Sequence, residues 1–108
     1  MKEVFEMRGN PGNMAGMMKK MQKLQKEMKA AQAQLDETEF TGQSANDYVT
    51  IKMNGKREVT DLTIKPDVID PDDPDMLEDL VIEAINNVLQ TVDQQTEQTM
   101  GQYTRGLM

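Results

Sequence analysis

The sequence contains no cysteine, histidine or tryptophan, and aromatic residues make up only 4% of the chain. Disulfides and thiolate metal sites are therefore excluded. The side chain best suited to acid–base catalysis at neutral pH is missing, and Ser44 is the only serine. No glycine-rich loop has the spacing that cradles a phosphate. These absences argue against an enzyme, and we expect no catalytic residue, metal, cofactor or small-molecule substrate.

Long apolar runs are also missing. No segment approaches the roughly 20 apolar residues that cross a bilayer, and the N-terminal MKEVFEMRGNPGN lacks the apolar stretch of a signal peptide. We therefore expect a cytoplasmic protein without a membrane partner. Hydrophobic residues make up 37% of the 108 residues, which predicts one small domain with a thin core. Such domains often gain stability by oligomerising, so self-association is expected.

The net charge of −7 would by itself disfavour nucleic acid as a partner, because affinity for phosphate comes mainly from Lys and Arg. The charges are unevenly distributed, however. Residues 1–31 have seven basic and three acidic side chains, residues 32–65 have four and six, and residues 66–108 have one and ten. Basic and acidic side chains thus belong to different structural elements.

The N-terminal third contains the clearest helical pattern. Residues 1–13 include the breaker sequence GNPG and are predicted to form a flexible arm. From Met14 the apolar residues follow a heptad spacing, which predicts a helix over residues 14–37 with Asn13 as its N-cap. At 1.5 Å per residue this helix is roughly 36 Å long, so part of its apolar stripe is expected to meet another chain. The stripe also includes Ala31, and its larger side chains are a candidate dimer or packing seam: Met14, Met17, Met21, Leu24, Met28 and Leu35.

Methionine thioethers also ligate cuprous copper, which is an alternative role for the stripe. The methionines of this chain occupy heptad a and d positions, and methionine fills adaptable apolar surfaces well. Packing is therefore the favoured interpretation.

Three short strands are predicted after this helix. The first, over residues 38–42, has a weak pattern, whereas residues 48–53 alternate between apolar and polar side chains. Asn54-Gly55 predicts a hairpin with a type I′ turn, and the return strand follows up to Lys65.

A second helix is predicted to begin with Asp73 as its N-cap and Pro74 at its first position. Its broad apolar face indicates that it packs on the core, and Gly101 is expected to end it before a flexible tail over residues 101–108. The carboxylates before this helix lack the spacing of an EF-hand and are interrupted by prolines, so a helix start is favoured over a calcium loop. The fold class is α+β: a long N-terminal helix, a three-stranded antiparallel sheet and a C-terminal helix, in a single domain over residues 14–100.

Basic residues lie opposite the apolar stripe of the first helix. Because successive residues are about 100° apart, Lys19, Lys23 and Lys26 fall within about 60° of one another and form a ridge about 10 Å long. A solvated helix face, an anionic membrane and a partner's groove are alternatives to nucleic acid as the role of this ridge. No aromatic residues alternate with these lysines and no Arg or Asn array accompanies them, so DNA binding would depend on phosphates and have weak sequence preference. The candidate DNA-binding residues are Lys19, Lys20, Lys23, Lys26 and Lys29.

Three stretches of the chain extend together over roughly residues 14–108: MAGMMKKMQKLQKEMKAAQAQLDETEFTG, YVTIKMNGKREVTDLTIKPDVIDPDDPDMLEDLVIEAINNVLQ and the terminal MGQYTRGLM. In this order they resemble the YbaB/EbfC family of nucleoid-associated proteins. The resemblance implies an α-β-β-β-α-like fold and a dimer from which the long helices project like tweezers. It also implies a cytoplasmic, nucleoid-associated protein that binds double-stranded DNA and influences nucleoid compaction and gene expression.

The chain departs from the family pattern in two places. Residues 43–47 replace a stretch that is often rich in glycine, and the C-terminal tail is short. A different class of function also remains open from the residues alone. In that alternative the protein is an interaction adaptor whose Met-rich amphipathic N-terminal helix docks in a partner's groove.

Overall fold

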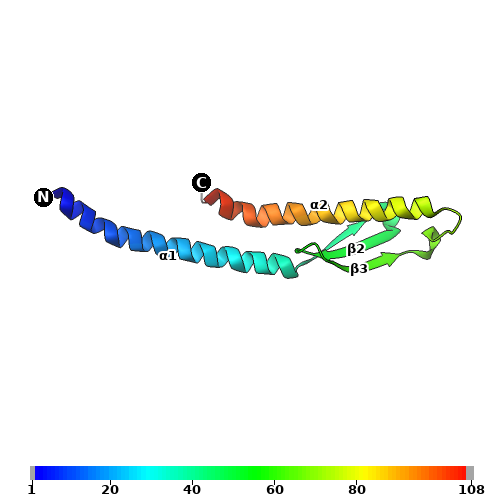
Figure 1. Cartoon of the computed structure of the whole chain (residues 1–108), viewed down its shortest axis with the longest axis horizontal. Coiled ribbons are helices and arrows are strands. Elements are labelled where there is room, and N and C mark those ends of the chain that lie inside the picture. The colour runs from blue at the N-terminus through cyan, green and yellow to red at the C-terminus, as the bar shows by residue number, and fades with distance from the viewer. Residues whose placement is uncertain (1, 107–108) are drawn as a thin grey trace.

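The computed structural model of the chain describes the backbone of residues 2–106 and the side chains of residues 14–103. It has the expected α+β architecture, with a long helix, a three-stranded antiparallel sheet and a second long helix (Figure 1). Two short 3-10 turns, Ala45–Asp47 and Pro66–Val68, connect these elements. The main elements are α1 (Lys2–Glu37), β1 (Glu39–Gln43), β2 (Val49–Asn54), β3 (Val59–Ile64) and α2 (Pro74–Gly106).

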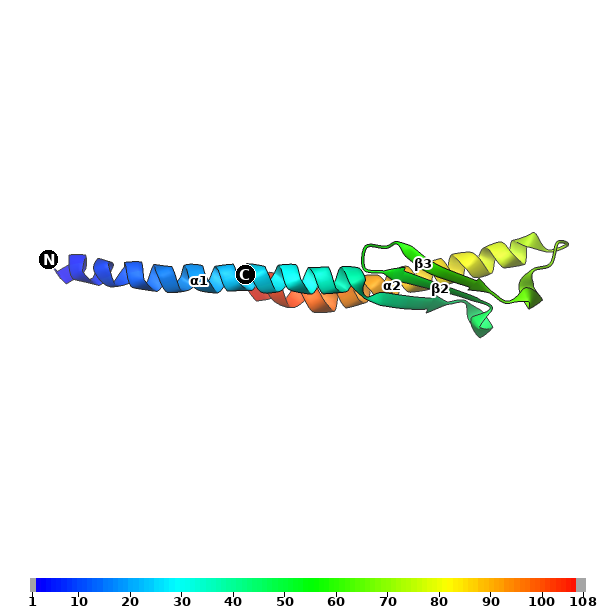
Figure 2. The same cartoon turned by 90° about the horizontal axis from the view of Figure 1, so that it is seen from below.

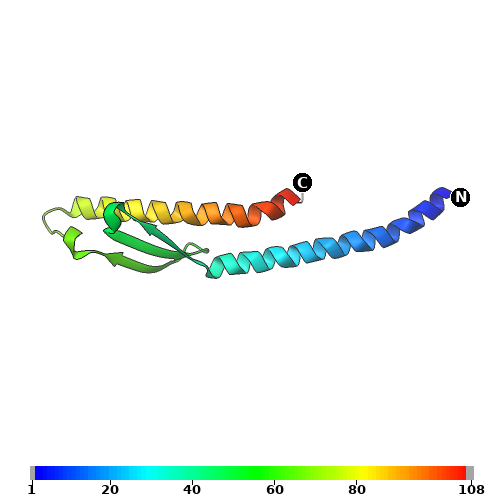
Figure 3. The same cartoon turned by 180° about the vertical axis from the view of Figure 1, so that it is seen from behind.

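The molecule is an elongated rod with dimensions of 88 × 20 × 16 Å. The first half of α2 lies over the sheet, and its second half runs beside the C-terminal part of α1 (Figures 1 and 3). The N-terminal part of α1 extends beyond the end of α2, while the turn that leads from β3 into α2 lies at the opposite end of the rod. The N-terminal part of α1 and the acidic residues 67–83 therefore lie toward opposite ends of the rod.

Both helices are longer than predicted. The expected end of the first helix at Glu37 is confirmed, but α1 begins at Lys2, so Asn13 is inside the helix and is not its N-cap. Likewise α2 continues through Gly101 to Gly106. Helix propagation is cooperative and an internal glycine costs only about 1 kcal/mol, so Gly101 need not stop α2. An internal proline costs about 3 kcal/mol, and nothing local in the sequence explains why α1 continues through Pro11. Flexibility of residues 1–13 and of the C-terminal tail stays a prediction, and residues 107–108 lie outside the described backbone.

The sheet has the strand order β1-β2-β3 with antiparallel pairing throughout. Opposite pairs include Phe40 with Met53 and Ile51 with Leu62. A bulge in β3 places Val59 opposite Met53, so that Val59 stays on the same face of the sheet as Leu62. Figure 2 shows the three strands beside one another, with α2 behind them.

The core lies between α2 and the first two strands. The inward-facing residues of β2 are buried, and α2 places Ala84, Val88 and Val92 against them at intervals of one helical turn. Leu35, in the last turns of α1, also belongs to this core, with 6% of its surface exposed. The full buried cluster consists of Leu35, Phe40, Val49, Ile51, Met53, Ala84, Val88 and Val92.

The hairpin between β2 and β3 is confirmed, but its predicted type I′ turn is wrong. That turn requires positive φ at both central residues, whereas Arg57 is the residue of this loop with positive φ, at 67°. The Arg57 N–H donates to the Asn54 carbonyl, and the Asn54 side-chain oxygen accepts from the N–H groups of Lys56 and Glu58. Asn54 therefore stabilises a three-residue loop by accepting hydrogen bonds with its side chain, and it does not itself adopt a positive φ.

Two glycines are required by close packing. A Cβ built on Gly55 would overlap the Leu35 carbonyl at the end of α1, and one on Gly42 would lie 2.6 Å from Val88 Cα. Because the atoms in the way belong to the backbone, the elements themselves would have to separate. The two glycines thus allow the sheet to approach α1 and α2 closely.

We expect Gly42→Ala to destabilise the protein by about 1–3 kcal/mol, because β1 and α2 must move apart to accommodate the methyl group. Gly16→Ala is a matched control, since a Cβ there has no neighbour within 4 Å and alanine favours a helix. Urea denaturation followed by circular dichroism, at equal protein concentrations, measures both variants. A Gly42→Ala protein as stable as Gly16→Ala would contradict the packing described for β1 and α2.

Candidate nucleic-acid interface

The five lysines singled out by the sequence all lie on α1 and are all exposed. None of them forms an ion pair with another side chain of residues 14–103, where the ion pairs are Lys52–Glu39 and Arg57–Asp93. Within residues 14–35, Glu27 is the only acidic side chain before the helix end. The positive charge of these lysines is therefore not neutralised within the described part of the chain.

Packing against α2 fixes the rotation of α1 about its axis. Leu24, Met28 and Ala31 are half-buried and Leu35 is buried, which places this side of α1 against α2. At about 100° per residue, Lys19, Lys23 and Lys26 lie on the opposite side of the helix. The lysine ridge thus points away from α2 into solvent.

The candidate seam has a covered part and an uncovered part, because α2 ends partway along α1. Its C-terminal part, from Leu24 to Leu35, lies beside α2 in the same chain. Its N-terminal part is uncovered: Met14, Met17 and Met21 are 60%, 63% and 54% exposed. Met18, which was not assigned to the seam, is 58% exposed beside them. Whether the seam holds a dimer stays a prediction.

The densest group of acidic residues, over residues 67–83, lies far from the lysine ridge. Residues 67–83 contain eight Asp and Glu side chains and no Lys or Arg, and they form the end of the rod opposite the N-terminus (Figure 1). Charges in water are screened over about 8 Å at physiological ionic strength. The rod is 88 Å long, so the acidic end contributes little to the potential at the lysine ridge despite the net charge of −7.

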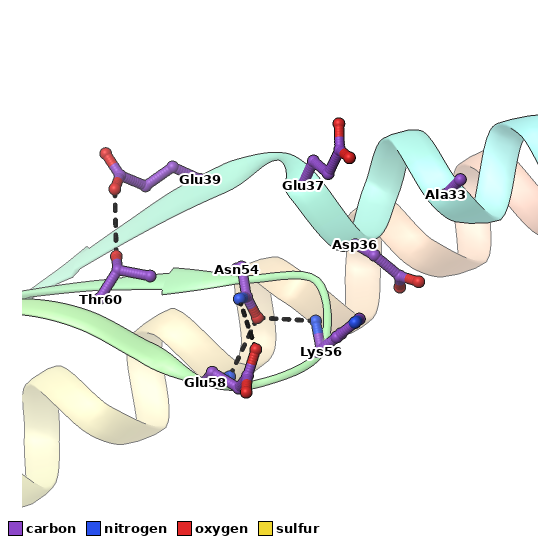
Figure 4. Close-up of a pocket in the computed structure, with 8 residues that line it drawn as sticks. All are labelled: Ala33, Asp36, Glu37, Glu39, Asn54, Lys56, Glu58 and Thr60. Atoms are coloured by element: carbon purple, nitrogen blue, oxygen red, sulfur yellow. Dashed lines mark hydrogen bonds between the residues drawn. The ribbon is translucent and has the colours of Figure 1, made fainter.

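An open pocket of about 470 Å³ lies where α1 meets the sheet and the hairpin (Figure 4). Its lining includes four carboxylates and only one cation, Lys56, so it does not suit a phosphate. Glu37 and Asp36 point in different directions, and Glu39 accepts a hydrogen bond from the Thr60 hydroxyl instead of facing them. The lining residues are Ala33, Asp36, Glu37, Glu39, Asn54, Lys56, Glu58 and Thr60.

Other polar residues considered in the sequence have structural roles. The Asp73 side chain accepts a hydrogen bond from the Met76 N–H at 3.3 Å, so Asp73 is the N-cap of α2 as predicted, with Pro74 at the first helical position. Ser44 is buried, and its hydroxyl oxygen accepts a hydrogen bond from the Val49 N–H at 2.9 Å. Neither helix of residues 2–106 has an apolar stretch long enough to cross a bilayer.

Sequence patterns did not reveal that β3 and α2 each leave large apolar side chains exposed. Val59 and Leu62 face the side of the sheet on which α2 lies, but α2 packs over β1 and β2 and leaves them 56% and 49% exposed. Ile82 and Ile85 on α2 are 55% and 36% exposed. We call these four residues the β3–α2 apolar surface. In the sequence, this surface was indicated only by the apolar face of α2, which is broader than the face that one narrow sheet can cover.

Comparison with known proteins gives consistent results. Residues 10–107 match the YbaB/EbfC DNA-binding family. A nucleoid-associated protein from Listeria monocytogenes is 54% identical over 101 residues, which cover 94% of this chain and 95% of the relative. One from Pediococcus pentosaceus is 48% identical over 101 residues, covering 94% and 97%. One from Lacticaseibacillus casei is 60% identical over 70 residues, covering 65% and 71%.

A solved structure also has this fold. An uncharacterized protein from Helicobacter pylori superposes with a TM-score of 0.64 at 20% sequence identity, over 76% of this chain and 86% of that one. The family resemblance noted in the sequence is thus confirmed over nearly the whole chain. The chain belongs to the YbaB/EbfC DNA-binding family.

Proposed function

We propose that the protein binds double-stranded DNA as a homodimer, mainly through backbone phosphates and with weak sequence preference. Acting at the nucleoid, it would contribute to compaction and thereby affect gene expression. Membership of a DNA-binding family and relatives named nucleoid-associated proteins support this proposal. They do not favour the adaptor alternative. The chemistry of the chain suits binding rather than catalysis, since it has neither histidine nor cysteine.

The lysine ridge is the observation on which the DNA-binding proposal depends. Its ammonium groups are exposed, unpaired among the described side chains, and directed away from α2. Lysine presents a compact point charge to phosphate, without the planar fork by which arginine recognises guanine. The side chains on this face therefore provide affinity for the backbone of DNA and little discrimination among bases.

The homodimer is proposed to form through the β3–α2 apolar surface. Both parts of this surface adjoin the core, because Leu62 pairs with the buried Ile51 across the sheet and Ile85 lies one turn from Val81 and Leu89, which pack against the core. Covering large apolar side chains that one chain leaves in water stabilises association. A two-fold dimer would carry two lysine ridges and double the number of phosphates engaged.

Binding should depend steeply on salt. If each chain contacts three phosphates, a dimer contacts about six, and the logarithm of the association constant should fall with a slope of about −5 against the logarithm of salt concentration. Fluorescence anisotropy with labelled duplexes of about 30 base pairs, of unrelated sequence, measures this slope. Equal affinities for the unrelated duplexes are expected.

A triple variant tests the lysine ridge itself. Lys19→Gln, Lys23→Gln and Lys26→Gln together should weaken binding on every duplex and flatten the salt slope, while changing stability by less than about 0.5 kcal/mol because the side chains are exposed. The control is Lys52→Gln, Lys56→Gln and Lys65→Gln, which changes the net charge equally but lies outside the ridge. If the two triple variants lose the same affinity, the ridge is not the DNA site.

The dimer surface is tested separately. Leu62→Asp with Ile85→Asp should convert a dimer into monomers, because each introduces a charge where apolar side chains meet. Met17→Gln with Met21→Gln should leave the dimer intact. Analytical ultracentrifugation distinguishes the two surfaces, and the opposite result would assign the dimer to the seam on α1.

A further inference from the structure

The N-terminal part of α1 has an apolar face that the other described side chains, residues 14–103, leave exposed. We call Met14, Met17, Met18 and Met21 the apolar arm face; the exposed fraction of each lies between 54% and 63%. The face continues the same stripe that packs against α2 one turn later, where Leu24 and Met28 become half-buried. A stripe that already packs against a helix thus extends beyond the end of that helix (Figure 1).

The apolar arm face and the lysine ridge lie on opposite sides of one helix. At about 100° per residue, Met17 and Met21 lie roughly 160° from Lys19 and Lys23. A duplex held by the lysine ridge therefore lies on the far side of α1 from these methionines. DNA binding would leave the apolar arm face exposed, and it remains available for a second contact.

We infer that the apolar arm face pairs with the same face of a second copy, and that this pairing joins separate DNA-bound dimers. The inference rests on the proposed DNA binding, and it adds a contact through which DNA segments are bridged. Continuity with the α1–α2 packing indicates that the occupant is a helix with an apolar stripe. Methionine side chains adapt to one another, so two copies of this face are mutually complementary.

The pairing is expected to depend on DNA. The lysine ridges of two paired arms point away from each other, so phosphates can occupy both ridges while the apolar arm faces meet. DNA holds many copies close together, which raises their effective concentration and favours a contact too weak to form in dilute solution. Pairing thus follows DNA binding.

A two-duplex assay tests this inference. One duplex is attached to beads, a second carries a fluorophore, and capture of the second duplex measures bridging. Met17→Gln, Met18→Gln and Met21→Gln together should reduce capture at least about ten-fold while changing single-duplex affinity less than about two-fold. The matched control, with leucine at the same three positions, keeps the face apolar and should retain capture.

Cysteine cross-linking tests the contact directly, because the natural chain has no cysteine. Met17→Cys should form an intermolecular disulfide on oxidation when DNA is present and much less without it. A disulfide forms only where the two Cα atoms lie within about 7 Å of each other, so it reports direct pairing of the arms. Ala15→Cys, exposed on the lysine side of the same helix, is the control.

The outcomes separate this inference from the proposed function. Undiminished capture by the glutamine variant, or equal cross-linking at positions 15 and 17, would overturn arm pairing and leave DNA binding intact. Failure of the unaltered protein to bind a single duplex would overturn both. Loss of capture with glutamine but not leucine, together with DNA-dependent cross-linking at position 17, would establish arm pairing.

Discussion

The contact between the last turns of α1 and α2 determines how the rest of the molecule presents its charges. Leu35 is anchored in the core, and Met28 and Leu24 continue the contact along α2. Residues 14–23, before this contact, lie beyond the end of α2. A shift of one residue in the packing would rotate each lysine by about 100°. The direction of the ridge is thus fixed by a few apolar side chains on the opposite side of the same turns of α1.

Much of the fold follows from local sequence patterns. The heptad stripe predicted the end of α1, the alternation over residues 48–53 predicted β2, and Asp73-Pro74 predicted the start of α2. Each of these signals depends on neighbouring residues only. The end of α2 was not predictable in the same way, because a cooperative helix can continue through an isolated glycine such as Gly101. The start of α1 was predicted wrongly, since α1 runs through residues 9–12, which disfavour a helix interior. The Asn54-Gly55 turn shows a related limit, since Gly55 is needed to avoid the Leu35 carbonyl, a contact between distant segments.

The candidate site was predictable in its composition but not in its surroundings. Helical periodicity alone placed the lysines opposite the methionines. The division of the seam into a covered and an uncovered part depends on where α2 ends beside α1, and the polar sequence near its C-terminus gave no indication of this. The uncovered side of β3 has a similar cause, because α2 lies over β1 and β2 rather than over the centre of the sheet. The position of a helix across a sheet depends on close contacts such as that between Gly42 and Val88. These residues are far apart in the sequence, so local patterns do not predict the contact.

The segregation of charge along the rod gives the molecule a large electric dipole moment. Its positive pole is the lysine-bearing helix and its negative pole is the turn between β3 and α2. In the field of a polyanion such a body experiences a torque as well as a force, so it rotates toward the surface with its N-terminal end leading before any contact is made. The torque extends only as far as the ionic atmosphere allows, about 30 Å in 0.01 M salt but about 8 Å at physiological ionic strength. In dilute salt, encounters would therefore begin already oriented, whereas in the cell orientation and contact would occur almost together.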